Sequence, residues 1–265
     1  MGITYVSWVA PVSAMGDFHC VTAIDPSNAA SMPDIDPGPY YIIDRAADAK
    51  YDGHAYTVPG DHEGLILREV KLGKQSLVDG YLDGNYAYMQ SENSELPFDT
   101  CGSSTLIICV ATAFIPESYV EAFFEYVTSG VTYRLDLHRK QLITTISGDA
   151  SAAGTFQPED EYDPEDGYYV PDIPEIGDVP GVVTAIFDVS KATIAAGQLR
   201  IRINGVDKEL TDVSNYTGSP FTLDKGQVRF GRFRCAPIYS MLVGTDIPSL
   251  AAYEQWCADR IGMDL

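Results

Sequence analysis

The pattern of apolar and polar residues is clearest in residues 181–265, where it predicts three strands and one helix. Residues 182–188 and 228–233 are strand-like runs. Between them, Leu199, Ile201 and Ile203 alternate with two arginines, which is typical of a strand with one buried face. This run ends in Asn204-Gly205, a strong hairpin signal because both residues tolerate positive φ.

The last predicted element is a helix over residues 249–261. Ser249 is a suitable N-cap and Gly262 a suitable residue just beyond the C-terminus. Spacings of three and four residues place one apolar set on a single helix face: Leu250, Tyr253, Cys257 and Ile261. We therefore expect this helix to cover an edge or end of the structure.

Upstream of these elements, the pattern also favours strands. Residues 106–114 form a continuous apolar run, which is typical of a strand buried on both faces. Further strand-like runs occupy residues 122–127, 132–138 and 141–146, and glycines or prolines separate most of them. This organisation predicts an all-β sandwich.

The first hundred residues are broken repeatedly by Pro, Gly and Asp. Residues 25–39 carry four prolines and predict a turn or extended loop, whereas residues 40–44 and 64–68 are strand-like. We interpret residues 1–100 either as an N-terminal arm or as the first strands of the sandwich with long loops. Residues 101–265 then form the main sandwich domain.

Three segments resemble the concanavalin A-like lectin/glucanase superfamily in its laminin-G-like form. They are residues 199–206 with their Asn-Gly turn, residues 228–231 with their final glycine, and the tail at residues 249–262. The resemblance covers about half of the chain. It implies an all-β, two-sheet antiparallel jelly-roll sandwich with one short C-terminal helix. The tail is similar to that of bacterial and phage members, and the superfold hosts hydrolases, lectins and structural modules.

Charge and composition narrow the possible partners. The chain has 38 acidic and 17 basic residues, a formal net charge of −21, which disfavours nucleic acid as a partner. The five cysteines show no CxxC pair and predict reduced thiols, with Cys109 buried. No signal peptide is visible and the longest apolar run is too short for a membrane helix, so we expect cytoplasmic synthesis and no membrane insertion.

The acidic charge is concentrated in residues 157–180, which hold nine acidic residues and no basic one. Within this insertion, Glu161, Asp163 and Glu165 match the E-x-D-x-E spacing of family 16 glycoside hydrolases, in which alternate strand residues face the sugar. Pro164 interrupts the motif and no tryptophan is near it. We therefore predict that the chain is not an enzyme.

The same insertion has two other interpretations besides a solvated loop. Carboxylates in a flexible loop are suitable Ca²⁺ ligands, and the candidates are Asp160, Asp163, Glu165 and Asp166. Tyrosines give large contact areas at low entropic cost, and the candidate contact residues are Tyr162, Tyr168 and Tyr169. No cofactor other than Ca²⁺ is expected.

Arginines gather in the runs at 199–203 and 228–234. Arg200, Arg202 and Arg232, together with Arg229 and Arg234, are candidates for a docking surface that binds acidic groups. The acidic group would come from the acidic loop of another copy or from a sugar acid. The alternative is internal charge balance across one sheet face.

The hypothesis that follows is a non-enzymatic structural or attachment protein. The resemblance implies a phage virion component, such as a head decoration, fibre or tail receptor-binding protein. Its partners would be other virion proteins, copies of itself or a surface glycan. The alternatives are a carbohydrate-binding lectin module and a family-16-like glycoside hydrolase using Glu161, Asp163 and Glu165.

Overall fold

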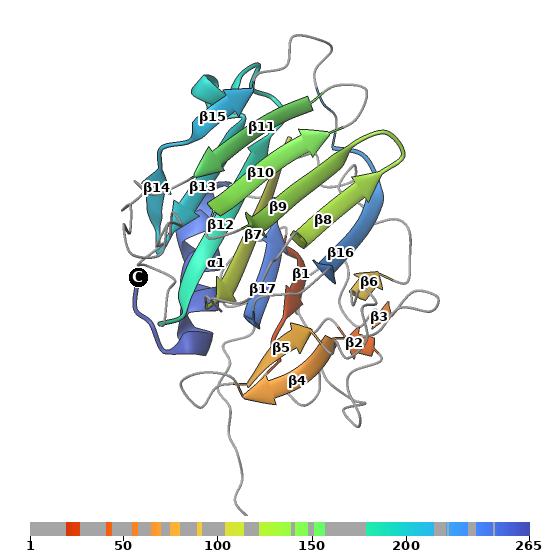
Figure 1. Ribbon diagram of the computed structural model, residues 1–265, viewed down its shortest axis with the longest axis vertical. Coiled ribbons are helices and arrows are strands. Elements are labelled where there is room, and N and C mark those ends of the chain that lie inside the picture. Colours follow the sequence, from red (N-terminus) through yellow and green to blue (C-terminus); the bar gives the residue numbers. More distant parts are fainter. Residues whose placement is uncertain are drawn as a thin grey trace, which may run out of the picture.

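The computed structural model describes fifteen stretches of the chain: residues 20–26, 41–43, 55–57, 65–69, 75–79, 89–91, 104–113, 122–138, 141–147, 151–156, 179–214, 221, 223–232, 237–245 and 247–265. These residues form two antiparallel sheets and one α-helix, α1 (Leu250–Ile261), which lies behind the sheets in the view of Figure 1. The predicted all-β jelly-roll sandwich with one short C-terminal helix is confirmed.

Sheet A lies between sheet B and α1 (Figure 1). Its strands follow the order β14 (Val206–Lys208), β13 (Leu199–Ile203), β12 (Gly181–Asp188), β7 (Thr105–Thr112), β17 (Ile238–Gly244), β5 (Gln75–Asp79) and β4 (Leu65–Glu69). An eighth strand, β1 (Cys20–Ile24), also pairs with β17.

Sheet B faces the viewer in Figure 1. Its nine strands follow the order β15 (Thr211–Ser214), β11 (Ser151–Phe156), β10 (Gln141–Ser147), β9 (Thr132–His138), β8 (Ala122–Thr128), β16 (Gly226–Arg232), β6 (Met89–Ser91), β3 (Ala55–Thr57) and β2 (Tyr41–Ile43). The described strands from the first hundred residues thus pair within both sheets, and the boundary at residue 100 stays a prediction.

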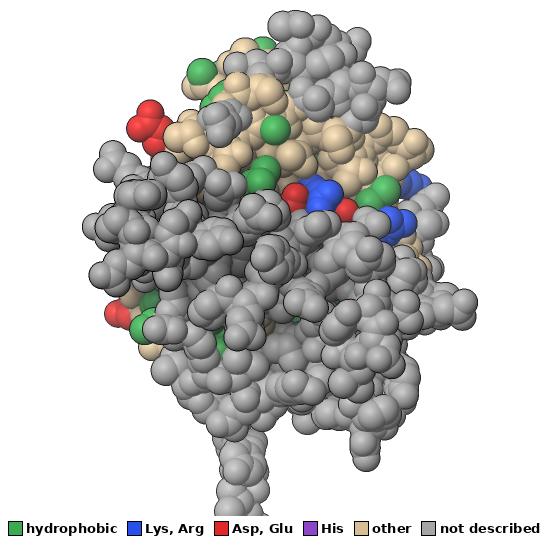
Figure 2. Space-filling view, viewed as in Figure 1, with side chains coloured by type: hydrophobic (Ala, Val, Ile, Leu, Met, Phe, Trp, Pro, Cys, Tyr) green, Lys and Arg blue, Asp and Glu red, His purple; other side chains and the backbone are tan. Residues whose placement is uncertain are grey.

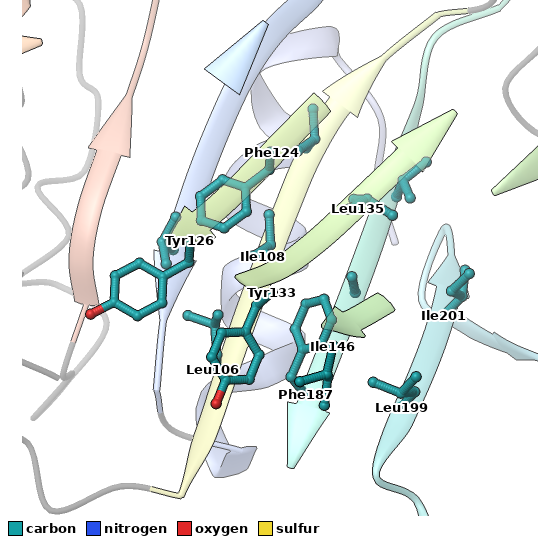
Figure 3. Close-up of a cluster of buried hydrophobic side chains, with 14 of the residues drawn as sticks. Leu106, Ile108, Phe124, Tyr126, Tyr133, Leu135, Ile146, Phe187, Leu199 and Ile201 are labelled. Atoms are coloured by element: carbon teal, nitrogen blue, oxygen red, sulfur yellow. The ribbon is translucent and has the colours of Figure 1, made fainter. Parts of the chain in front are cut away.

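The main core lies between the two sheets. Side chains from β7, β12 and β13 on one sheet and from β8, β9 and β10 on the other point toward one another (Figure 3). The alternation predicted for residues 199–203 is confirmed, because Leu199, Ile201 and Ile203 are buried while the two arginines between them are half-buried. Burying this apolar surface is the main stabilising contribution to such a sandwich.

A second apolar layer separates sheet A from α1 and explains why β7 is buried along its whole length. Ile107, Cys109 and Ala111 point toward the helix, whereas the alternate residues of β7 enter the main core. The prediction that this strand is buried on both faces is therefore confirmed. Cys109 and Cys257 lie buried on either side of this layer and are not joined in a disulfide, and the predicted burial of Cys109 is confirmed.

Of the two predicted caps of α1, only the one at the C-terminus is confirmed. Gly262 adopts the left-handed conformation at φ 73° and closes the C-terminus, as predicted. Ser249, however, makes no side-chain capping hydrogen bond. Its backbone, at φ −91° and ψ 2°, continues a 3₁₀ turn over Ile247–Ser249 and lacks the extended conformation of an N-cap.

The predicted Asn204-Gly205 turn joins β13 to β14. Both residues have positive φ, at 48° and 77°. The Asn204 side chain also accepts a hydrogen bond from the backbone N–H of Val182 at 2.8 Å, which ties the turn to β12. The turn therefore fixes the register of three neighbouring strands at this edge of sheet A.

Candidate functional site

Residues 157–178 of the acidic insertion lie outside the described part of the chain. This applies to the hydrolase motif and to the candidate Ca²⁺ ligands and contact residues: Asp160, Glu161, Tyr162, Asp163, Glu165, Asp166, Tyr168 and Tyr169. Their roles stay predictions. Among the residues that the structure describes, no group of three or more His, Cys, Asp or Glu side chains is arranged to hold a metal ion.

Arg200 and Arg202 are held in an ion-pair network on the outer face of sheet A. Asp207 on β14 bridges them, with 2.6 Å from its Oδ1 to Arg200 Nη2 and 2.9 Å from its Oδ2 to Arg202 Nη1. Arg202 Nε donates to Glu254 Oε1 on α1 at 2.8 Å, and this hydrogen bond raises the pKa of Arg202. Both arginines thus balance acidic partners within the chain.

The arginines of β13 and β16 do not lie on one sheet face, which the charge-balance interpretation of the sequence assumed. β13 is the second strand of sheet A, whereas β16 lies between β8 and β6 in sheet B. Strand partners depend on long-range pairing, which the order of residues along the chain does not reveal. For Arg232 the backbone pairs with Ala122, and its side chain lies outside the described part of the structure.

Sheet B carries a different polar arrangement on its outer face. Directly paired residues of an antiparallel sheet lie on the same face. The pairing between neighbouring strands therefore sets one cross-strand row on this face, made of Gln90, Arg229, Glu125, Arg134 and Thr145. The residues that alternate with this row, such as Phe124 and Leu135, point into the core. We call this set the outer row of sheet B.

Arg134 is the centre of a charged cluster in the outer row. Its Nε lies 2.6 Å from Asp136 Oδ1 and 3.8 Å from Glu125 Oε1. The Arg134 side chain is 30% exposed, whereas those of Glu125 and Asp136 are 5% and 11% exposed. Figure 2 looks onto this face and shows basic and acidic side chains next to one another at the surface. Carboxylates that are so nearly buried need charged or hydrogen-bonding partners, which a polar ligand can also supply.

Arg229 is held by a different kind of contact. Gln227, two residues earlier on β16, donates from Nε2 to the Ser91 carbonyl oxygen of β6 at 3.1 Å. Arg229 Nε donates to the Oε1 of the same glutamine at 3.0 Å. This chain of hydrogen bonds orients the half-buried guanidinium of Arg229 on the outer face.

The outer row carries both donors and acceptors on one face of sheet B, which suits a ligand rich in hydroxyl groups. The sequence interpretation did not identify Glu125, Arg134 or Asp136 as functional residues. The sequence did indicate part of this face. Apolar and polar residues alternate at 132–138, which places Arg134 and Asp136 on the side of the strand away from the apolar side chains. What the alternation does not show is that Glu125 and Arg229 lie in the same row.

No protein-family model matches the chain, and no curated protein matches its sequence. Among solved structures, the chain is similar to the binding domain of botulinum neurotoxin DC in complex with SialylT. The TM-score is 0.55 at 10% identity, and the match covers 91% of this chain and 52% of that one.

Two further structures are similar at a TM-score of 0.51. One is the same neurotoxin binding domain in complex with rat synaptotagmin II, at 10% identity, covering 90% of this chain and 52% of that one. The other belongs to a study of botulinum neurotoxin type C entry through two ganglioside molecules, at 11% identity, covering 90% and 51%. The chain thus spans about half the length of these structures, and at such identity the likeness shows the fold, a lectin-like β-sandwich.

Proposed function

We propose that this chain is a non-enzymatic attachment module that binds a glycan on the outer face of sheet B. The observation that carries the proposal is the outer row, which gathers Arg229, Glu125 and Arg134 from three neighbouring strands. α1 packs on the outer face of sheet A, so it does not cover the outer face of sheet B. Sugar hydroxyls both donate and accept hydrogen bonds, which matches a row of mixed charge.

The similarity to neurotoxin binding domains supports the same proposal. Two of those structures are described as complexes, with SialylT and with rat synaptotagmin II, and the third is described by the dependence of cell entry on two ganglioside molecules. We further propose that the module belongs to a phage virion, as a head decoration, fibre or tail receptor-binding component. This finer assignment rests on the resemblance of the tail at residues 249–262 to phage members of the laminin-G-like group.

Binding of the purified full chain to an array of bacterial and host glycans tests the proposal. We expect at least one glycan to bind, and Arg134→Gln to weaken that binding by about tenfold, because a charge-assisted hydrogen bond contributes about 1.5–3 kcal/mol. Lys191→Gln, an exposed change just after the end of β12 in sheet A, serves as the matched control and should bind as the wild type does.

Two outcomes would overturn the proposal. The first is the absence of any glycan binding by a folded chain, checked by its thermal transition. The second is release of new reducing ends from a bound glycan by the wild type. The second outcome would favour the hydrolase alternative, and loss of that cleavage in Glu161→Gln or Glu165→Gln would assign it to the acidic motif.

A further inference from the structure

Arg229 differs from the other arginines whose side chains the structure describes. Four of them lie within ion-pair distance of a carboxylate: Arg134, Arg200, Arg202 and Arg260. Among the described residues, Arg229 forms no ion pair, and its hydrogen bond goes to the neutral Gln227 through Nε. In a chain with a net charge of −21, Arg229 is the exception among the arginines whose side chains are described.

The geometry around Arg229 leaves its guanidinium ready for a bidentate contact. Gln227 is itself fixed by the Ser91 carbonyl, so the Nε edge of the guanidinium is held in place. The two terminal Nη groups form the fork that matches a planar carboxylate in two parallel hydrogen bonds. A guanidinium that is oriented before the ligand arrives loses less side-chain entropy on binding.

The neighbours of Arg229 in the outer row restrict the kind of anion that can bind to it. Glu125 is the residue directly opposite Arg229 on β8, and its carboxylate lies on the Arg134 side at 3.8 Å from Arg134 Nε. A doubly charged group such as a phosphate monoester would be repelled by this carboxylate more strongly than a singly charged one. A monovalent carboxylate therefore fits best.

The rest of the row suits the remainder of a sugar. Adjacent strands are about 4.8 Å apart, so Glu125 and Arg134 follow Arg229 in steps of about that length. A carboxylate bound at Arg229 would place the attached ring over β8. There, the Arg134 guanidinium, whose side chain is 30% exposed, can donate hydrogen bonds to ring oxygens.

We propose that Arg229 binds the carboxylate of an acidic sugar, of the uronic or sialic acid class, as the anchoring contact of the glycan on sheet B. This inference rests on the proposed glycan-binding function and names its ligand class. Gln227 then acts as a positioning residue, because it touches the guanidinium and not the ligand.

The test uses the full chain and pairs of probes that differ only at the carboxyl group. Suitable pairs are an oligoglucuronate and its carboxyl-reduced form, and a sialylated glycan and its carboxyl-reduced form, titrated by calorimetry. We expect reduction of the carboxylate to weaken binding about tenfold or more, and Arg229→Gln to cause the same loss for the acidic probe. Arg229→Gln should not weaken binding of the carboxyl-reduced probe.

Two further variants separate charge from geometry. Arg229→Lys keeps the charge and removes the fork, so the acidic probe should bind more weakly than to the wild type and more tightly than to Arg229→Gln. Gln227→Ala should weaken binding of the acidic probe and leave binding of the reduced probe unchanged. Lys191→Gln removes an exposed positive charge elsewhere and should change neither. Thermal melting confirms that each variant is folded.

The outcomes distinguish this inference from the proposed function. If acidic and reduced probes bind equally, or Arg229→Gln binds the acidic probe normally, the inference is wrong while glycan binding stands. If no glycan binds to the folded chain, both are wrong. If polyglutamate binds through Arg229 more tightly than every acidic sugar, the carboxylate comes from a protein segment and the sugar assignment is wrong.

Discussion

At the scale of single residues, Cys257 makes a prediction about pH. Burial raises the pKa of this thiol to about 12. In the unfolded chain the thiol ionises near its ordinary pKa of about 8.5, so above this pH the unfolded state binds fewer protons than the folded state. We therefore expect the free energy of unfolding to fall as pH rises from about 8.5 toward 12, by up to about 1.4 kcal/mol per pH unit from this group.

Urea denaturation at several pH values between about 8 and 10 measures this dependence. Cys257→Ala removes the titrating group, so its free energy of unfolding should fall less steeply with pH than that of the wild type, whatever its absolute stability. Burial also raises the pKa of Tyr133, which contributes in the same direction and remains in both chains. Parallel slopes in the two chains would contradict the prediction.

At the scale of elements, the docking of α1 depends on a nearly buried ion pair. Glu254 is 2% exposed at its side chain and pairs with Arg202 of β13, while Asp207 on the other side of Arg202 is 50% exposed. Removing one partner of a buried pair leaves the other charge without compensation. We expect Glu254→Gln to lower the free energy of unfolding by about 1–3 kcal/mol.

Asp207→Asn is the matched control, because it removes a carboxylate from the same arginine at an exposed position. Its cost should stay below about 1 kcal/mol, as for other exposed ion pairs. Chemical denaturation of both variants makes the comparison. If Glu254→Gln also costs less than about 1 kcal/mol, the apolar layer holds α1 and the buried ion pair adds little to docking.

At the scale of the whole molecule, the net charge of −21 predicts a response to salt. Like charges destabilise a compact state, and salt screens them over a Debye length of about 10 Å at 0.1 M. We expect the melting temperature to rise when NaCl increases from about 0.02 to 0.3 M. A falling melting temperature would show that ion pairs such as the one at Glu254 outweigh the general repulsion.

The same measurement tests the predicted Ca²⁺ site at Asp160, Asp163, Glu165 and Asp166. CaCl₂ and NaCl are compared at equal ionic strength, with the chelator EDTA added afterwards. Specific binding to the folded state stabilises it beyond general screening, and chelation reverses only that part. Equal melting temperatures in the two salts would contradict the predicted Ca²⁺ site.

The local elements could be predicted from the amino-acid sequence. The alternation at residues 199–203 predicted a strand with one buried face, and Asn204-Gly205 predicted its turn, because both depend on residues close together in the chain. The helix followed from spacings of three and four residues. The strand at Ile238–Gly244 was not predicted, although it lies beside β7 in the middle of sheet A.

Which strands are neighbours could be read only from the folded structure. Alternation predicts that the Arg134 side chain points away from the core, but it does not reveal which strand lies beside β9. Arg229 and Glu125 are 104 positions apart in the chain and become neighbours because β16 pairs with β8. The separation of β13 from β16 into two sheets arises in the same way. Strand pairing is long-range and is selected by the packing of the whole core, so the outer row exists only in the folded molecule.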